Sequence, residues 1–164
     1  MTGVEVLLAL ALGGALETLG PAVTYRAVTL EPNERRRFTV PGLERVTGST
    51  GACVEEGTDQ ELPDTFFLQA SCGGVRTTTV WRSGGKRVWV LACAEDERTP
   101  ALLAVRRALQ RELAGLRAVT ACVRRGHVEL WGWVANEKER EKVAAAVRRR
   151  SPDAVVDKVE TLGE

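Results

Sequence analysis

Few residues of this chain could act as acid, base or metal ligand. The sequence contains one histidine, His127, which excludes any site that needs two imidazoles. Glu129 shares a strand face with His127, but such a pair without a nucleophile motif does not make a catalytic site. The glycine pairs at 73–74 and 84–85 lack the strand-to-helix context of a phosphate-binding loop. We therefore expect a protein that is not an enzyme and that uses no metal and no cofactor.

The second group with chemical potential is the cysteines, which are Cys53, Cys72, Cys93 and Cys122. No two form a Cys-x-x-Cys pair, which disfavours zinc sites and thioredoxin-type redox centres. Either they form disulfides, for which three pairings exist, or they stay reduced as small buried side chains. If strands near 52–55 and 66–71 pair as a hairpin, their outer ends bring Cys53 close to Cys72. Cys93 would then pair with Cys122 and tie the two parts of the chain together.

An apolar run at residues 4–16, interrupted only by Glu5, opens the chain. Its length suits the apolar core of a signal peptide and falls short of the roughly 20 residues of a membrane span. No Lys or Arg precedes it, and residues 13–15 are the best candidate for a cleavage site. The alternative is an N-terminal helix packed on the body. We expect a signal-peptide-like leader over residues 1–20 and an exported protein.

Residues 24–94 have the pattern of strands, with no helical period of useful length. The clearest signal is two apolar, β-branched runs, TTTVW and RVWVLA, around a loop with two glycines, which is typical of a hairpin. Further strands are expected at 25–30, 37–40, 52–55 and 66–70. This segment predicts a small all-β, sandwich-like module.

A different period begins near residue 99. Thr99 is a suitable helix N-cap, Pro100 suits the first helical position, and apolar residues then recur at helical spacing up to residue 116. Two alternating strands follow, then a helix capped by Asn136, and a last strand at 154–161. The order α-β-β-α-β predicts helices on one face of a sheet over residues 99–162, so the expected fold class is α+β.

The alternation of the 127–134 strand places two tryptophans on the sheet face opposite the helices. Such a two-layer unit leaves that face open, so the indoles need a cover. Three covers are open: the first module, near one of its tryptophans; a neighbouring subunit or another envelope protein; or a membrane surface. The candidate interface residues are Trp131, Trp133, Glu129, Trp81 and Trp89.

Three pieces of the second segment occur in a familiar order: the hairpin RRGHVELWGWV, the helix start ANEKEREKVAAAV and the closing strand DAVVDKVETL. Together they resemble the BON family of bacterial envelope domains. The hairpin residues at the family's positions are Gly126, Val128, Leu130, Gly132 and Val134. The resemblance implies a BON-like module over residues 99–162.

The first segment contains VTLEPNERRRFTVPGLERVTGST and, later, FFLQASCGGVRTTTVW before the glycine-rich hairpin. These stretches resemble the N-terminal periplasmic domain of pilus secretins, the Tad/Flp type in particular, in which a BON-like domain commonly follows. The loop GTDQELPD and the four cysteines are not part of that pattern. No secretin barrel follows in this sequence, so the resemblance implies no pore activity.

The two resemblances imply a non-enzymatic scaffold or accessory protein of a pilus or secretion apparatus, in the periplasm or cell envelope. Its partners would be envelope or secretion-system proteins, including further copies of itself. The alternative is an envelope-maintenance protein that associates with phospholipid through the second module. The arginines at 148–150 would then meet headgroups, although they also complement the helix dipole. The balance of 23 basic and 22 acidic residues disfavours a nucleic-acid partner.

Overall fold

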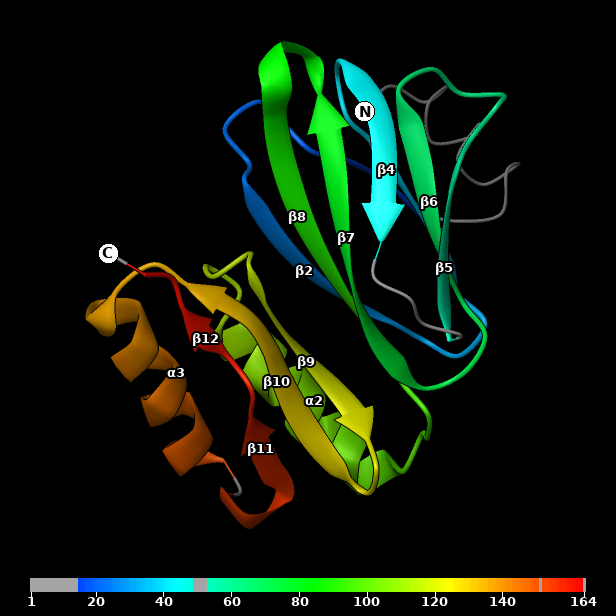
Figure 1. Ribbon diagram of the computed structural model, residues 1–164. Helices are drawn as coiled ribbons and strands as arrows, with labels where there is room; N and C mark the ends of the chain where they lie inside the picture. The colour runs from blue at the N-terminus through cyan, green and yellow to red at the C-terminus, as the bar shows by residue number, and fades with distance from the viewer. Residues whose placement is uncertain (1–14, 49–52, 151, 164) are drawn as a thin grey trace, which may run out of the picture.

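The computed structural model of the chain describes residues 15–48, 53–150 and 152–163. Two four-stranded sheets form the upper half of the molecule and a unit with two helices forms the lower half (Figure 1). The first sheet has the order β1 (Ala15–Thr18), β3 (Arg35–Thr39), β6 (Thr65–Ala70) and β5 (Val54–Thr58). The second sheet has the order β2 (Tyr25–Leu30), β8 (Lys86–Ala94), β7 (Gly74–Arg82) and β4 (Leu43–Gly48).

The two sheets share one apolar core because alternate side chains of each point toward the other. Phe38 and Phe66 of the first sheet stack with ring centroids 5.1 Å apart and are fully buried. Val80, Val88 and Val90 of the second sheet belong to the same buried cluster. The glycine-rich turn expected between β7 and β8 is present at Ser83–Gly85.

The lower unit contains α2 (Pro100–Glu112), β9 (Val119–Arg124), β10 (His127–Val134), α3 (Glu137–Arg149), β11 (Val155–Asp157) and β12 (Glu160–Thr161). β10 pairs with β9 antiparallel and with β11 and β12 parallel. Both helices pack on the sheet face that carries Val128, Leu130 and Val134. The Asn136 side chain accepts the backbone N–H of Glu139 and so caps α3. The α+β fold class is confirmed.

Some sequence expectations differ from the structure at the beginning of the chain. The leader was expected to reach residue 20, but Ala15–Thr18 is a strand parallel to β3, and Leu19 is fully buried in the core. The rest of the leader and part of its cleavage site lie outside the described residues. Strand β4 was not expected, because its sequence LERVTG is mostly polar and shows no alternation of apolar residues. Within the described residues, no helix is long and apolar enough to cross a bilayer.

Gly132 of β10 allows the close approach of the chain before β9. Its φ is +128°, and a Cβ there would lie 1.8 Å from the carbonyl oxygen of Ala118. We expect Gly132→Ala to lower the free energy of unfolding by about 2 to 3 kcal/mol, because backbone must move. Urea unfolding followed by tryptophan fluorescence measures this. The control is Gly20→Ala, whose Cβ would meet no atom within 4 Å; equal losses in both variants would contradict the explanation.

Candidate interaction surface

The outer face of the second sheet is half covered by the lower unit. Ala27, Leu91 and Cys93 of the sheet form one buried cluster with Cys122 of β9. Trp131 and Trp133 pack against this cluster and are partly buried. The first module is thus the cover that the structure shows for these two tryptophans, one of the three that the sequence left open.

Two disulfides join the cysteines in the pairing that the sequence favoured. Cys53–Cys72 closes the hairpin of β5 and β6. Cys93–Cys122 links the end of β8 to β9, and both residues are fully buried. Disulfides persist in oxidising compartments, so the two bonds indicate an exported protein.

Beside the disulfide, the edge of β2 meets the edge of β9 through side chains and not through a strand ladder. The hydroxyl groups of Thr29 and Thr120 share a hydrogen bond of 2.6 Å, and the Thr29 hydroxyl also lies 2.6 Å from the carbonyl oxygen of Ala121. Further along, the Ala27 N–H donates to the carbonyl of Arg117 at 3.1 Å. These bonds fix the orientation of the two modules.

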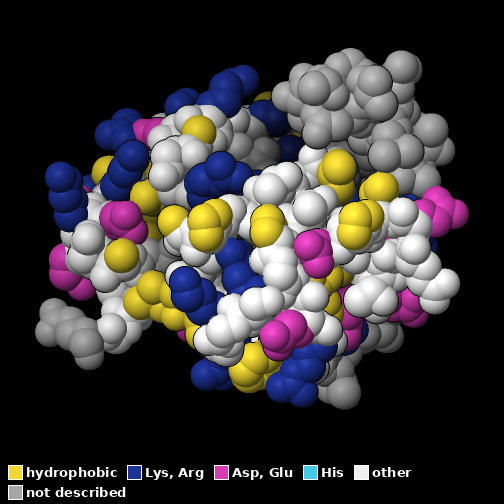
Figure 2. Space-filling model, turned by 90° about the horizontal axis from the view of Figure 1, so that it is seen from above, with side chains coloured by type: hydrophobic (Ala, Val, Ile, Leu, Met, Phe, Trp, Pro, Cys, Tyr) yellow, Lys and Arg dark blue, Asp and Glu magenta, His cyan; other side chains and the backbone are white. Residues whose placement is uncertain are grey.

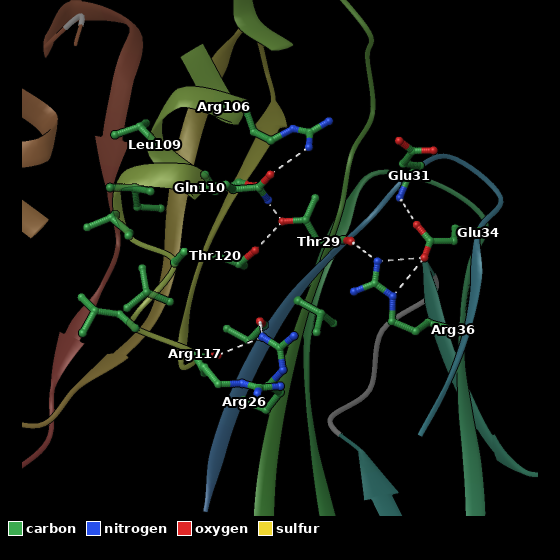
Figure 3. Close-up of a pocket in the computed structure, with 18 of the residues that line it drawn as sticks. Arg26, Thr29, Glu31, Glu34, Arg36, Arg106, Leu109, Gln110, Arg117 and Thr120 are labelled. Atoms are coloured by element: carbon green, nitrogen blue, oxygen red, sulfur yellow. Dashed lines mark hydrogen bonds and ion pairs between the residues drawn. The ribbon is translucent and has the colours of Figure 1, made fainter. Parts of the chain in front are cut away.

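A polar cleft of about 900 Å³ opens along this seam, between β2 and β3 on one side and α2 and β9 on the other (Figure 3). Several arginines line it, but the chain itself supplies their acceptors. Arg26 donates to Glu17 at 2.7 Å, and Arg36 donates to Glu34 and to the carbonyl of Thr29. The cleft is therefore part of the contact between the two modules, which we call the joint.

Glu129, one of the candidate interface residues, is buried on the same face of β10 as Trp131 and Trp133. Its carboxylate accepts the Trp131 indole N–H at 2.9 Å and the Arg124 guanidinium at 2.7 Å, and it lies 3.2 Å from the His127 Nε2. Only 3% of Glu129 is exposed. Burial raises the pKa of this carboxyl, but Trp131, Arg124 and His127 outweigh burial and hold the pKa below its usual value. Glu129 therefore orients Trp131 instead of contacting a partner.

Low pH should lower the free energy of unfolding because it protonates Glu129. Because its folded-state pKa is lowered, its contribution is complete above the unfolded-state pKa of about 4.3 and is lost as pH falls through the lower folded-state value. We expect the free energy of unfolding to decline below about pH 4.3, and less steeply in Glu129→Gln. Urea unfolding at a series of pH values from 7 to 3 measures both slopes. Parallel slopes would show that Glu129 does not carry this dependence.

The other half of the same sheet face is left open by the residues that the structure describes, and it carries a row of stacked rings and guanidinium groups. The Trp81 ring has the Arg45 guanidinium at 4.5 Å and that of Arg87 at 4.6 Å. Next to them, Trp89 stacks on Tyr25 with centroids 5.1 Å apart. We call these five residues the aromatic–arginine row. Its end is continuous with the joint, because the Tyr25 ring lies 5.1 Å from that of Trp133.

The charge of this open face is positive. Since Val80, Val88 and Val90 point into the core, the alternate positions face outward, and these are Thr79, Trp81, Arg87 and Trp89. On β4, Arg45 opposite Trp81 and Thr47 opposite Thr79 complete the face. None of these side chains is acidic. Among the described residues neither Arg45 nor Arg87 has an ion pair, and both are exposed. Glu44 lies at the adjacent β4 bulge and is exposed.

Seen from above, hydrophobic side chains appear as separate spots between basic and acidic ones (Figure 2). The arginines that end α3 have carboxylate partners: Arg148 pairs with Glu141, and both Arg149 and Arg150 pair with Glu112. In residues 15–48, 53–150 and 152–163 no cluster of three His, Cys, Asp or Glu side chains could hold a metal ion.

Comparison with known proteins gives no family. No family model and no curated protein matches the chain. The solved structures that are similar to part of it include the following two. The first is a cysteine protease inhibitor, EhICP2, from Entamoeba histolytica, at 11% identity over 49% of this chain and 96% of that one, with a TM-score of 0.33. The second is the solution structure of amebosin, at 13% identity over 50% of this chain and 100% of that one, with a TM-score of 0.27.

Proposed function

We propose that this protein is a non-enzymatic scaffold or accessory component of a pilus or secretion apparatus, located in the periplasm or cell envelope. Three features support the proposal. The α+β fold joins an all-β module to a unit with the order α-β-β-α-β-β, in which two short strands, β11 and β12, take the place of the single last strand expected. Two disulfides suit an exported protein. The quoted stretches resemble the N-terminal domain of pilus secretins and a BON domain in the order those proteins use.

The observation that carries the proposal is the half-open face of the second sheet. Its lower half is already an interface, because it packs on the second module and is cross-linked to it. Its upper half presents the aromatic–arginine row, and tryptophan, tyrosine and arginine are the residue types that dominate the energy of protein interfaces. The disulfide and the seam hold both modules in one orientation, so the open half is pre-formed for packing against a partner protein.

The lipid-binding alternative has less support. It depended on the arginines at the end of α3, and Arg148, Arg149 and Arg150 all have glutamate partners. A cation that is paired within the chain attracts anionic lipid less than a free one, since the pair has little net charge.

Site-specific photo-crosslinking in the native cell envelope tests the proposal. A photoreactive amino acid replaces Thr79, which faces outward beside the row, and the matched control carries it at the exposed Lys138 on α3. We expect the Thr79 position, and not Lys138, to give one discrete product that contains a secretin, a pilus-assembly subunit or a second copy of this chain. The absence of any discrete product, together with salt-sensitive binding of the purified protein to anionic vesicles, would favour the lipid alternative.

A further inference from the structure

We infer that the aromatic–arginine row is a docking face for an acidic protein segment whose carboxylates bind Arg45 and Arg87 together. The inference rests on the proposed function and adds to it the chemistry of the partner. The argument uses the geometry of the two guanidinium groups, the charge around them and the shape of the face.

The two guanidinium groups are held in place before any partner arrives. Arg45 on β4 and Arg87 on β8 are the cross-strand neighbours of Trp81, which stands between them on β7. Their guanidinium carbons lie 4.5 and 4.6 Å from the Trp81 ring centroid, so they are at most about 9 Å apart. Stacking on the indole leaves the edges of each guanidinium free to donate hydrogen bonds. Such ordering lowers the entropy that binding must overcome.

These cations lack the compensation that other arginines of the chain have. Arg26 is bound to Glu17 and Arg76 to Glu56, each at 2.7 Å or less. On the open face the outward neighbours are threonines and aromatic rings, so a partner must supply the negative charge. Glu44 at the β4 bulge is the nearest acidic residue in sequence, and it forms no ion pair among the residues that the structure describes.

A protein carboxylate fits this geometry well. A guanidinium fork binds a carboxylate through two parallel hydrogen bonds. In an extended segment, side chains on the same face repeat every 6.8 Å or so, which matches two guanidinium groups within about 9 Å of each other. Thr47 and Thr79 lie beside Trp81 and Trp89, where their hydroxyl groups can bond the backbone of such a segment. Each basic residue near an anionic membrane adds only a small attraction, so two arginines are too few to bind the protein stably to a bilayer.

The first test uses a synthetic peptide of alternating Glu and Thr and its Gln–Thr counterpart, with binding followed by NMR of the arginine side-chain N–H groups. We expect the acidic peptide alone to shift the Arg45 and Arg87 signals, more weakly at higher salt. The double variant Arg45→Gln/Arg87→Gln should bind the acidic peptide about 25-fold more weakly, because each of the two lost pairs weakens binding about fivefold. Arg45→Lys/Arg87→Lys keeps the charge but not the planar fork, and should recover only part of the affinity.

The matched control is Lys138→Gln/Lys142→Gln, which removes two exposed positive charges from α3 and should leave binding unchanged. Unfolding midpoints equal to that of the wild type verify that the variants fold. Two results would overturn the inference. One is that Arg45→Gln/Arg87→Gln and Lys138→Gln/Lys142→Gln bind the acidic peptide with equal affinity. The other is that the peptide does not shift the Arg45 and Arg87 signals.

The photo-crosslink from Thr79 separates this inference from the proposed function. A product with an envelope protein that persists in Arg45→Gln/Arg87→Gln would overturn the inference and leave the proposed function standing. A product that disappears in Arg45→Gln/Arg87→Gln, but persists in Lys138→Gln/Lys142→Gln, supports both the inference and the proposed function. The absence of any product in the wild type counts against the proposed function itself. Binding of anionic vesicles that depends on the two arginines, without binding of the acidic peptide, would assign the face to lipid and overturn the inference.

Discussion

Replacing Glu95 by alanine should lower the free energy of unfolding by about 3 to 5 kcal/mol, the largest effect expected of any single substitution considered for this protein. Glu95 follows directly after β8, and its side chain is fully buried. One carboxylate oxygen accepts the backbone N–H of Val123 at 2.9 Å, and Arg106 of α2 lies 3.3 Å from both oxygens. Without the carboxylate, the buried Arg106 keeps its charge but loses its anion.

Compensating variants test that physical reason. Glu95→Gln/Arg106→Met removes both charges and keeps an acceptor for the Val123 N–H, so it should recover most of the loss. The matched control is Glu141→Ala, which breaks the exposed pair with Arg148 and should cost less than about 1 kcal/mol. Urea unfolding at pH 7 gives all three values. If Glu95→Ala costs no more than Glu141→Ala, the carboxylate does not hold the joint together.

Removing the inter-module disulfide should lower the free energy of unfolding by about 3 to 4 kcal/mol, since the bond closes a loop between cysteines separated by 29 positions. The variant is Cys93→Ala/Cys122→Ala. The Trp131 indole N–H, which donates to Glu129 beside this bond, should also exchange faster with solvent, because the joint opens more often.

The second disulfide supplies the control. Cys53→Ala/Cys72→Ala opens a loop of similar span, 19 positions, and should cost about 3 kcal/mol, but it lies within the first module. It should leave the exchange of the Trp131 indole unchanged. Unfolding measurements combined with hydrogen exchange followed by NMR give both readouts. Equal acceleration of the Trp131 exchange in the two double variants would mean that the Cys93–Cys122 bond does not specifically hold the modules.

Much of the fold could be predicted from the sequence where one face of an element is buried. The β7–β8 hairpin and both helices were predicted because their apolar residues repeat at the period of their structure. β1 and β4 were missed for opposite reasons. Residues 15–18 continue an apolar run that looked like a leader, and β4 is an edge strand whose polar side chains show no alternation.

The candidate surface was predicted in part. Alternation placed Trp131 and Trp133 on the free face of their sheet, but their cover is decided by long-range packing against the cluster of Ala27, Leu91 and Cys93, which no local pattern encodes. Arg45 and Arg87 were not singled out at all. They become neighbours of Trp81 only through the register of three strands, and that register includes β4.

The contact between the edges of β2 and β9 affects the solubility of the first module when it is produced without the second. An exposed strand edge invites pairing with other chains, and here each of these two edges is shielded by the other module. Residues 15–94 expressed alone would expose the β2 edge, the apolar Leu91 and an unpaired Cys93. Such a fragment would be prone to aggregate and to form mixed disulfides between molecules. The first module therefore depends on the second for its solubility, and a gene rearrangement that separated them would leave the first module prone to aggregate.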